Sequence, residues 1–343
     1  MRSDRPKKSR HPAWNAIGFV AVVVAVVAGG NELLPKGQAA TPTAARSTPG
    51  VTAPAQPSAS SAPAAVPVPA AGPSTTAASV PAGTLFDDFS YSGPDDPSLG
   101  AHGWQARTQA GGPGIQDTWS TAGVSFPAVA DAQGGRALQL QVVTDGTTAG
   151  TKQAELVSSG ADFFTGTYAA RIYFNDQPTS GQGGDHIVQA FYANSTSEKS
   201  SLYSELDNEY MPDGGWGAPG PALDTTSWYD ASKPDRVTHR SHSSLQGWHT
   251  VMITAVNGTV VYSIDGQKVF TSQGRYFPRE SMGIHFNAWL IDLPFTGAPR
   301  TWDMRVNWVY YQTGQAKSLT EVQKTVQGYY AKGTHYVNTP AKP

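Results

Sequence analysis

Three acidic residues alternate with other residue types in one short segment, Ser204-Glu205-Leu206-Asp207-Asn208-Glu209-Tyr210. Alternate side chains of an extended strand share a face, so Glu205, Asp207 and Glu209 would project together. Like charges held this close repel one another and raise each other's affinity for protons. A solvated acidic strand would normally intersperse lysine or arginine, and none occurs between Lys199 and Arg236. The pattern therefore favours a cluster of coupled carboxyl groups.

Paired carboxyl groups are suited to the cleavage of glycosidic bonds. A retaining mechanism needs an ionised carboxylate as nucleophile and a protonated carboxyl as acid, about 5–5.5 Å apart. On a straight strand Glu205 and Glu209 would be about 13 Å apart at Cα, and side chains leaning together on a concave sheet would close most of that gap. Asp207 between them would hold one neighbour by a hydrogen bond and help separate the two proton affinities.

Two other interpretations of the acidic segment remain open. It could be an acidic surface strand with no chemistry, or it could hold a structural calcium ion. Calcium does bind clustered carboxylates, but it usually takes them from a loop that wraps around the ion.

Strand-like segments follow one another from Leu85 to Tyr311. Glycine and proline are abundant, with 36 and 26 residues, which favours many short strands joined by turns. Alternating apolar patterns predict strands at 137–142, 167–174, 185–192, 250–256, 260–264, 282–289 and 304–311. Asn257-Gly258 and Asp265-Gly266 are hairpin-turn signals. No helices alternate with these strands, so the prediction is an all-β sandwich of two antiparallel sheets.

The C-terminal segment has a different pattern. Ser318 and Glu321 match a capping box, in which the serine side chain and the glutamate side chain satisfy each other's backbone N–H groups. Leu319, Val322 and Val326 recur at helical spacing. One short helix, packed on the sandwich, is expected there.

Composition excludes several functional classes. The chain has no cysteine, so disulfides, thiolate metal sites and thiol catalysis are impossible. The formal net charge of -2 gives no reason to expect nucleic acid as a partner. His239 and His242 lie in a segment, 236–244, that is predicted to be a polar loop, and no third ligand is near them in sequence. No metal site and no cofactor site are predicted from these residues.

The N-terminal quarter divides into two segments of unlike composition. Residues 1–34 have a basic head followed by an apolar run of valine and alanine, which predicts a signal peptide or a retained membrane anchor. Residues 35–83 are almost wholly Ala, Pro, Ser, Thr, Val and Gly, and this composition predicts a disordered linker. The strand-rich domain is expected to span 84–312, followed by an extension over 313–343. We therefore expect an extracellular protein or one anchored at the cell surface, with tethering to membrane or cell wall through the N-terminus.

Several segments, taken in order, resemble glycoside hydrolase family 16. Glu205-Leu206-Asp207-Asn208-Glu209 is similar to the family's E-x-D-x-E signature. Further similar segments are Gly166–Ile172, the W-H-T…Y-x-x-D-G hairpin at 247–250 and 262–266, the M-x-I-x-F-N-x-W strand Met282–Trp289, and the closing strand Val306–Tyr310. The likeness covers about 85–311. It implies a concanavalin-like β-jelly-roll fold.

The resemblance also implies a role for each acidic residue. Glu205 would be the nucleophile, Glu209 the general acid and then base, and Asp207 the assisting carboxylate. The reaction would be hydrolysis of an internal β-glycosidic bond with retention of configuration. Asn208 departs from the family, which usually has an apolar residue there. Asn307 stands where an aspartate often helps to bind a structural calcium, and its presence argues against calcium as a cofactor.

Aromatic and polar residues near the acidic segment are candidates for sugar binding. Sugar rings present flat C–H faces, which aromatic rings can cover. The candidates for substrate binding are Tyr203, Trp216, Trp228, Trp289, Asn287 and His186, and Tyr229 is a further aromatic candidate.

Three functional hypotheses follow from the sequence. The first is an exported, monomeric endo-β-glycosidase that hydrolyses a polysaccharide, with β-1,3- or mixed-linkage glucan as the first guess from the family's commonest activities. The second is a carbohydrate-binding module of the same fold without chemistry, although it would not need all three carboxyl groups. The third is a cell-wall transglycosylase, which would use a sugar instead of water as acceptor.

Overall fold

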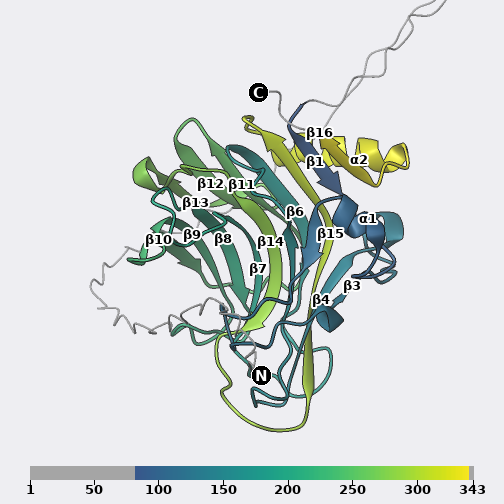
Figure 1. The fold of residues 1–343 in the computed structure, drawn as a ribbon, viewed down its shortest axis with the longest axis vertical. Coiled ribbons are helices and arrows are strands. Elements are labelled where there is room, and N and C mark those ends of the chain that lie inside the picture. The colour runs from purple at the N-terminus through teal and green to yellow at the C-terminus, as the bar shows by residue number, and fades with distance from the viewer. Residues whose placement is uncertain (1–81, 340–343) are drawn as a thin grey trace, which may run out of the picture. The chain divides into compact units, whose positions relative to one another are not determined.

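The computed structural model describes residues 82–339, so the predicted N-terminal segment 1–34 and almost all of the predicted linker lie outside the described residues. Residues 82–339 form two antiparallel sheets that face each other across a buried core (Figure 1). The fold is a jelly-roll sandwich, as the sequence predicts. Within this range no helix combines the length and the apolar character needed to cross a membrane.

The seven-stranded sheet carries the acidic segment. Its strands lie in the order β10-β9-β8-β7-β14-β5-β2. Their bounds are Asp235–Ser241 for β10, Ala222–Asp230 for β9, Glu205–Met211 for β8, Ile187–Asn194 for β7, Gly283–Leu290 for β14, Ala154–Ser158 for β5 and Trp104–Ala106 for β2. The acidic segment is therefore an inner strand with a hydrogen-bonded neighbour on each side.

The nine-stranded sheet covers one face of the first sheet. Its main path is β13-β12-β11-β6-β15-β1-β16, and β4, which also pairs with β3, pairs with β15. The bounds are Gln267–Gln273 for β13, Thr259–Ile264 for β12, Gly247–Val256 for β11, Gly166–Phe174 for β6, Arg300–Thr313 for β15, Thr84–Asp87 for β1, Tyr336–Thr339 for β16, Leu138–Thr144 for β4 and Val124–Ser125 for β3. A short helix, α1 (Pro97–Ala101), precedes β2.

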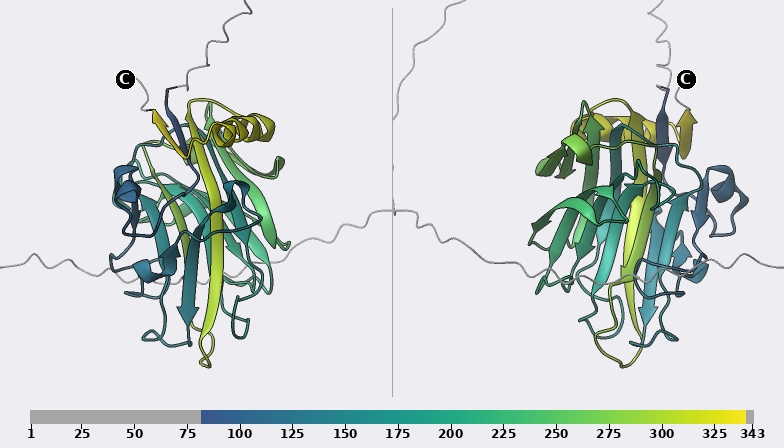
Figure 2. Two further views of the ribbon diagram at one scale, coloured as in Figure 1. Left: turned by 90° about the vertical axis from the view of Figure 1, so that its right-hand side faces the viewer. Right: turned by 60° about the vertical axis from the view of Figure 1, so that its left-hand side comes forward.

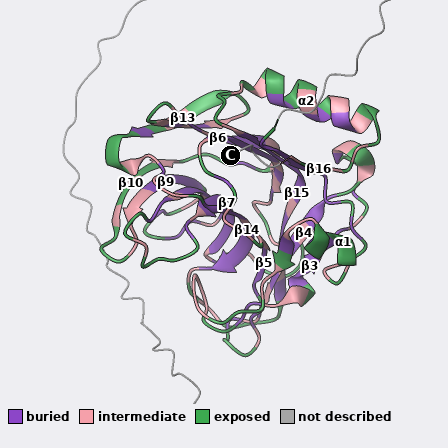
Figure 3. Cartoon of the chain, turned by 45° about the horizontal axis from the view of Figure 1, so that its top comes forward, coloured by how far each residue is buried: buried purple, intermediate pink, exposed green. Residues whose placement is uncertain are grey.

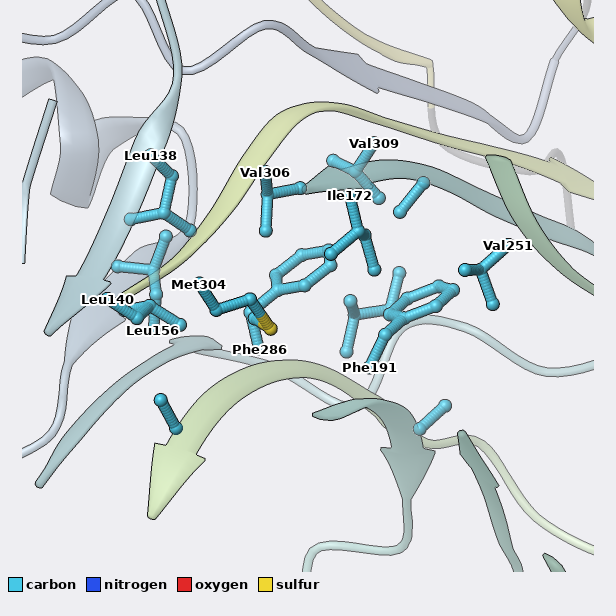
Figure 4. Close-up of a cluster of buried hydrophobic side chains, with 14 of the residues drawn as sticks. Leu138, Leu140, Leu156, Ile172, Phe191, Val251, Phe286, Met304, Val306 and Val309 are labelled. Carbon is cyan, nitrogen blue, oxygen red and sulfur yellow. The ribbon is translucent and has the colours of Figure 1, made fainter. Parts of the chain in front are cut away.

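The core lies between the two sheets and is built by side-chain alternation. Leu206 and Tyr210 of β8 belong to the large buried cluster there, together with Phe191 and Phe286, whose rings stack at 5.0 Å. Figure 4 shows Phe191 and Phe286 from one sheet facing Ile172, Val306 and Val309 from the other. This core fixes which face of β8 points inward, because a slip of one residue would exchange its two faces.

Two tight turns of the nine-stranded sheet match the sequence signals. Asn257 and Gly258 join β11 to β12 with φ of 53° and 76°, and Asp265 and Gly266 join β12 to β13 with φ of 49° and 77°. Positive φ at both central positions suits a hairpin turn, and asparagine, aspartate and glycine tolerate it best.

The C-terminal segment folds against the outer face of the nine-stranded sheet. Helix α2 (Leu319–Ala331) begins at the capping box of Ser318 and Glu321, as predicted. Val322 and Val326 pack on Trp308, and Figure 3 shows α2 on the side of β6 and β15 that is away from β7 and β14. Strand β16, which the sequence analysis missed, then pairs with β1; Figure 2 shows it beside α2 at the end where β1 begins.

One strand assignment from the sequence is wrong. The segment 236–244 was predicted to be a polar loop, but Asp235–Ser241 forms β10, the edge strand of the seven-stranded sheet. It lacks an apolar face because its partners are polar: Arg240 pairs with Asp224 of β9, and Arg236 lies over the ring of Trp228 at 4.4 Å. Long-range pairing overrides the weak local pattern.

A buried ion pair joins the two sheets next to β7. Asp185, two residues before β7, accepts hydrogen bonds from the guanidinium of Arg300 and, at 2.9 Å, from the indole N–H of Trp302. Both charged side chains are fully buried. The pair fixes the start of β7, which lies directly beside the acidic strand.

Asn208 is expected to destabilise the core behind the acidic residues. It is 1% exposed, and neither atom of its amide has a partner within 82–339. Leaving buried polar groups unpaired costs about 1–3 kcal/mol. We predict that Asn208→Val raises the free energy of unfolding by roughly that amount, measured by urea titration. Asn338→Val, the same change at an exposed position of β16 whose side chain has a hydrogen-bond partner in Tyr336, is the control and should not raise the free energy of unfolding. A destabilised Asn208→Val variant would show that the amide has partners.

Candidate active site

The acidic side chains lie on the outer face of the seven-stranded sheet. Leu206 and Tyr210 point into the core between the sheets, so Glu205, Asp207 and Glu209 point the opposite way. The predicted projection of the three acids onto one face is thus confirmed. Asp207 is buried, and the two glutamates are partly exposed.

Glu205 is held in place by its neighbours. The hydroxyl of Tyr203 donates a hydrogen bond to its Oε2, and the carboxyl of Asp207 also hydrogen-bonds to it. Burial raises the pKa of Glu205, and these two hydrogen bonds and the charge of His285 oppose that rise. All three opposing contacts favour the ionised form of Glu205.

Asp207 is the group best suited to stay protonated. Burial raises its pKa well above the usual range, and the charges of Glu205 and Glu209 raise it further. The indole N–H of Trp228 donates to its Oδ2 at 2.8 Å. A protonated Asp207 can donate its own proton to Glu205 while accepting from Trp228. The proton on Asp207 therefore stabilises the ionised form of Glu205, while Asp207 itself stays neutral.

Glu209 differs from the other two acids because no side chain or backbone group within 82–339 donates a hydrogen bond to its carboxyl. Burial raises its pKa to about 8, with contributions from the charges of Glu205 and of Asp224, its cross-strand partner on β9. Arg236 and Arg240 limit this rise. At neutral pH Glu209 therefore carries a proton, and its carboxyl has no hydrogen-bond partner among residues 82–339.

The three environments create two kinds of carboxyl group on one strand. Glu205 is oriented by its neighbours, whose contacts limit the rise in its pKa, whereas the pKa of Glu209 rises to about 8 and its carboxyl is free to donate a proton. Separated proton affinities in adjacent carboxyl groups are the basis for assigning a nucleophile and an acid. The arrangement can therefore attack an electrophilic carbon from Glu205 and protonate a leaving oxygen from Glu209.

A second polar network, which the sequence analysis missed, lies on the same face and spans β7, β14 and β5. The buried carboxylate of Glu155 accepts from Arg107 at 2.8 Å and from the hydroxyl of Tyr192 at 3.0 Å, and it contacts Nδ1 of His285 at 2.7 Å. The rings of Tyr192 and His285 stack at 4.5 Å. Tyr192 is the cross-strand partner of Asp207, so the network supports the acids from the β7 side.

In the sequence, only the alternation of side chains along the strands could have indicated this network. His285 shares a strand face with Trp289, which was a candidate, and Glu155 is the one acid in its strand. Arg107 follows β2 and is 48 residues away from Glu155, so no local pattern could pair them.

Three of the predicted sugar-binding aromatic residues lie on the same face. Trp216, in the turn after β8, is 46% exposed, and its ring packs on that of Trp289 at 5.7 Å. Arg240 donates to the carbonyl oxygen of Trp216 at 3.1 Å and so ties this turn to β10. Trp228 is half-buried beside Glu205, its cross-strand partner. Their role in binding stays a prediction.

Of the other predicted binding residues, Tyr203, Asn287 and Tyr229 cannot present a face to a ligand beside the acids, whereas His186 is partly exposed. Tyr203 is 2% exposed and serves Glu205, and Asn287 is fully buried, with its amide donating to Tyr192 at 3.2 Å. Tyr229 was misplaced by the sequence analysis: it faces away from the acids, with the guanidinium of Arg279 at 3.9 Å from its ring centroid. His186 precedes β7 and contacts Asp292 at 2.8 Å near the surface.

The residues around Asn307 do not fit a calcium ion. Its Oδ1 accepts from the guanidinium of Arg171 at 2.8 Å and from the backbone N–H of Gln133 at 2.9 Å. Its amide nitrogen donates to the carbonyl oxygens of Gln133 and Arg136. The oxygen atoms that a cation would need are thus already used, and a positive charge lies beside them. Within 82–339 no group of three or more His, Asp or Glu side chains could hold a metal ion.

Comparisons with known proteins agree with this fold. A GH16 protein of a mixed-linkage glucan PUL from Bacteroides ovatus, solved in complex with its G4G4G3G product, is 17% identical with a TM-score of 0.51, and the match covers 65% of this chain and 98% of that chain. A glycoside hydrolase family 16 endo-glucanase from Bacteroides ovatus, in complex with G4G3G-2F-DNP, is 18% identical with a TM-score of 0.51 and the same coverage. At this identity the likeness is one of fold. No family model and no curated protein matches the sequence.

The raised pKa of Glu209 predicts a pH-dependent cost to stability. The folded state keeps the proton up to about pH 8, whereas the unfolded state loses it near pH 4.5. Stability therefore falls as pH rises through this window. Glu209→Gln cannot ionise. The difference between its melting temperature and that of the wild type should therefore shift in favour of the variant from pH 5 to pH 8 and stay constant above pH 8. Glu198→Gln, at an exposed glutamate of the loop before β8, should show no such trend. A constant difference for Glu209→Gln would contradict the assigned pKa.

Proposed function

We propose that this protein is a retaining glycoside hydrolase of the family 16 type, which cleaves internal β-glycosidic bonds of a polysaccharide. The observation that carries the proposal is the contrast between Glu205 and Glu209. Glu205 receives hydrogen bonds from Tyr203 and Asp207, whereas Glu209 has a pKa of about 8 and a carboxyl without a hydrogen-bond partner in the described part of the chain. The E-x-D-x-E pattern and the shared fold are consistent with this function.

In the first step the Glu205 carboxylate attacks the anomeric carbon. The bond from that carbon to the leaving oxygen breaks, and the proton of Glu209 moves to that oxygen. The product is a glycosyl ester on Glu205 and an ionised Glu209. Loss of negative charge from Glu205 and its gain by Glu209 leave the net charge of the pair unchanged, which limits the electrostatic cost in a partly buried site.

In the second step water replaces the leaving group. Glu209, now ionised, takes a proton from water as the oxygen attacks the anomeric carbon, and the Glu205 carboxylate is released. Two inversions give overall retention. Throughout, Tyr203 and Asp207 hold the rotamer of Glu205, and their hydrogen bonds strengthen when its negative charge returns.

We propose β-1,3- or mixed-linkage glucan as the first substrate to test. Two solved structures of this fold carry oligosaccharide ligands, and one of them is described as an endo-glucanase. The exposed ring of Trp216, which packs on the buried Trp289, and Trp228 beside Glu205 would cover the apolar faces of glucose units. Transfer to a sugar acceptor would use the same chemistry, and sizing the products with a labelled acceptor separates the two reactions.

The two glutamates should differ in how substitution affects the rate. Glu205→Gln should abolish hydrolysis of glucan. Glu209→Gln should lower kcat on glucan by about 10²–10⁴-fold, the usual contribution of a general acid. With an aryl glycoside whose leaving group needs no proton, Glu209→Gln should still form the glycosyl ester, and azide should restore its turnover.

For the wild type, kcat/KM should decline above about pH 8, and ¹H NMR should detect the β-anomer first.

The control for these assays is Asp95→Asn, which removes an exposed carboxyl before α1 and should leave kcat/KM unchanged. Undiminished hydrolysis by Glu205→Gln would contradict the proposed chemistry. So would a wild-type protein that binds glucans and hydrolyses none of them. The second result would instead support a carbohydrate-binding module.

We further propose that the chain is exported and that residues 1–34 direct this step. The support is the basic head followed by an apolar run in the sequence. Mass spectrometry of the mature protein should find an N-terminus within or just after this segment if it is a cleaved signal. An intact N-terminus in the membrane fraction would identify an anchor, and full-length protein retained in the cytoplasm would contradict export.

A further inference from the structure

A polar cavity of about 270 Å³ lies between helix α2 and the nine-stranded sheet, on the sheet face opposite the core. Its lining includes Gln133, Arg171, Thr250, Trp308, Gln323 and Gln327. Arg171 of β6 is the cross-strand partner of both Trp308 of β15 and Thr250 of β11. These three residues therefore lie side by side on three neighbouring strands and form the floor of the cavity. The two helix glutamines cover this row from above.

The charge of Arg171 has no counter-ion. The guanidinium donates to the neutral amide oxygen of Asn307 at 2.8 Å and lies over the ring of Trp248 at 4.4 Å. No ion pair within 82–339 includes Arg171. Asp131 and Asp265 act on it only at longer range, and burial lowers its pKa more than they raise it. A half-buried guanidinium without a carboxylate is costly unless an anion accompanies it.

A second observation points to the same missing acceptor. Trp308 is 1% exposed, lines the cavity, and its indole N–H has no hydrogen-bond partner within 82–339. Gln133 donates its amide to the side-chain oxygen of Gln327 at 3.2 Å. The lining therefore combines a guanidinium with neutral amide groups, a buried indole N–H beside them lacks an acceptor, and no carboxylate contributes to the lining.

We propose that this cavity binds an oxoanion, such as a carboxylate or phosphate group, at Arg171. Guanidinium groups bind such anions by two parallel hydrogen bonds, and the neutral amide groups of the lining can donate further ones. The volume exceeds that of a bare anion and approaches the lower end of small-molecule sites, roughly 300 Å³. The anion can thus be free phosphate or belong to a larger molecule such as a uronic acid. The cavity and the acidic strand lie on different sheets, so the two proposals stand independently.

The test follows the indole N–H resonances of the full chain labelled with [¹⁵N]tryptophan, with Trp308→Phe used for assignment. Inorganic phosphate, glucuronate and glucose are titrated at constant ionic strength. Phosphate or glucuronate should shift the Trp308 resonance to saturation, and glucose should not. Tighter binding of glucuronate than of phosphate would assign the anion to a sugar carrier, and the reverse would assign free phosphate.

The variants locate the site. Gln323→Glu places a carboxylate at the cavity on an exposed helix position and should raise Kd at least tenfold, as should Arg171→Gln. Thr320→Glu makes the same charge change in the first turn of α2, outside the lining, and should keep the wild-type Kd. Absence of saturation with both anions, an equal response to glucose, or equal Kd values for Gln323→Glu and Thr320→Glu would overturn the proposal. Gln323→Glu remains informative if Arg171→Gln fails to fold.

Discussion

Side-chain alternation along β8 places an apolar core on one face of the strand and three acidic residues on the other. Leu206 and Tyr210 are buried in the core between the sheets, and the intervening acids all reach the other face of the same strand. β8 is an inner strand, so hydrogen bonds to β7 and β9 hold its register on both sides. A slip of one residue would place three carboxyl groups in the apolar core. The core therefore fixes the position of the acids more firmly than any contact of the acids themselves.

Electrostatic differences among the three acids come from contacts within the β8 segment and from the strands beside it. Glu205 is oriented by Tyr203 and Asp207, while Asp224 of β9 and Arg240 of the edge strand β10 act in opposite directions on Glu209. The edge strand β10 thus has a function despite its polar sequence. Its Arg240 neutralises Asp224 by a paired hydrogen bond and also holds the turn of Trp216. One residue connects the electrostatics of the acids with the position of an exposed aromatic ring.

The outer faces of the two sheets carry uncompensated groups of opposite sign. The seven-stranded sheet exposes coupled acids, and the nine-stranded sheet covers the unpaired Arg171 with helix α2. Asn307 affects the charge around Arg171 in two ways. As a neutral amide it cannot balance the guanidinium, and by filling its hydrogen bonds with Gln133 and Arg136 it excludes a cation. The region that the family resemblance associates with calcium is therefore electropositive here.

The sequence by itself determined the sandwich, the capped helix, the hairpin turns and the shared face of Glu205, Asp207 and Glu209. These depend on periodicity and on local backbone preferences, which neighbouring residues specify. The tertiary structure alone decided that Tyr203 and Asn287 are buried, that Tyr229 faces away from the acids, and that β10 is a strand. It alone joined Glu155 to His285 across 130 positions and Arg240 to Asp224 across 16. Burial and proton affinity depend on groups brought close by strand order, and strand order is set by the packing of the whole core.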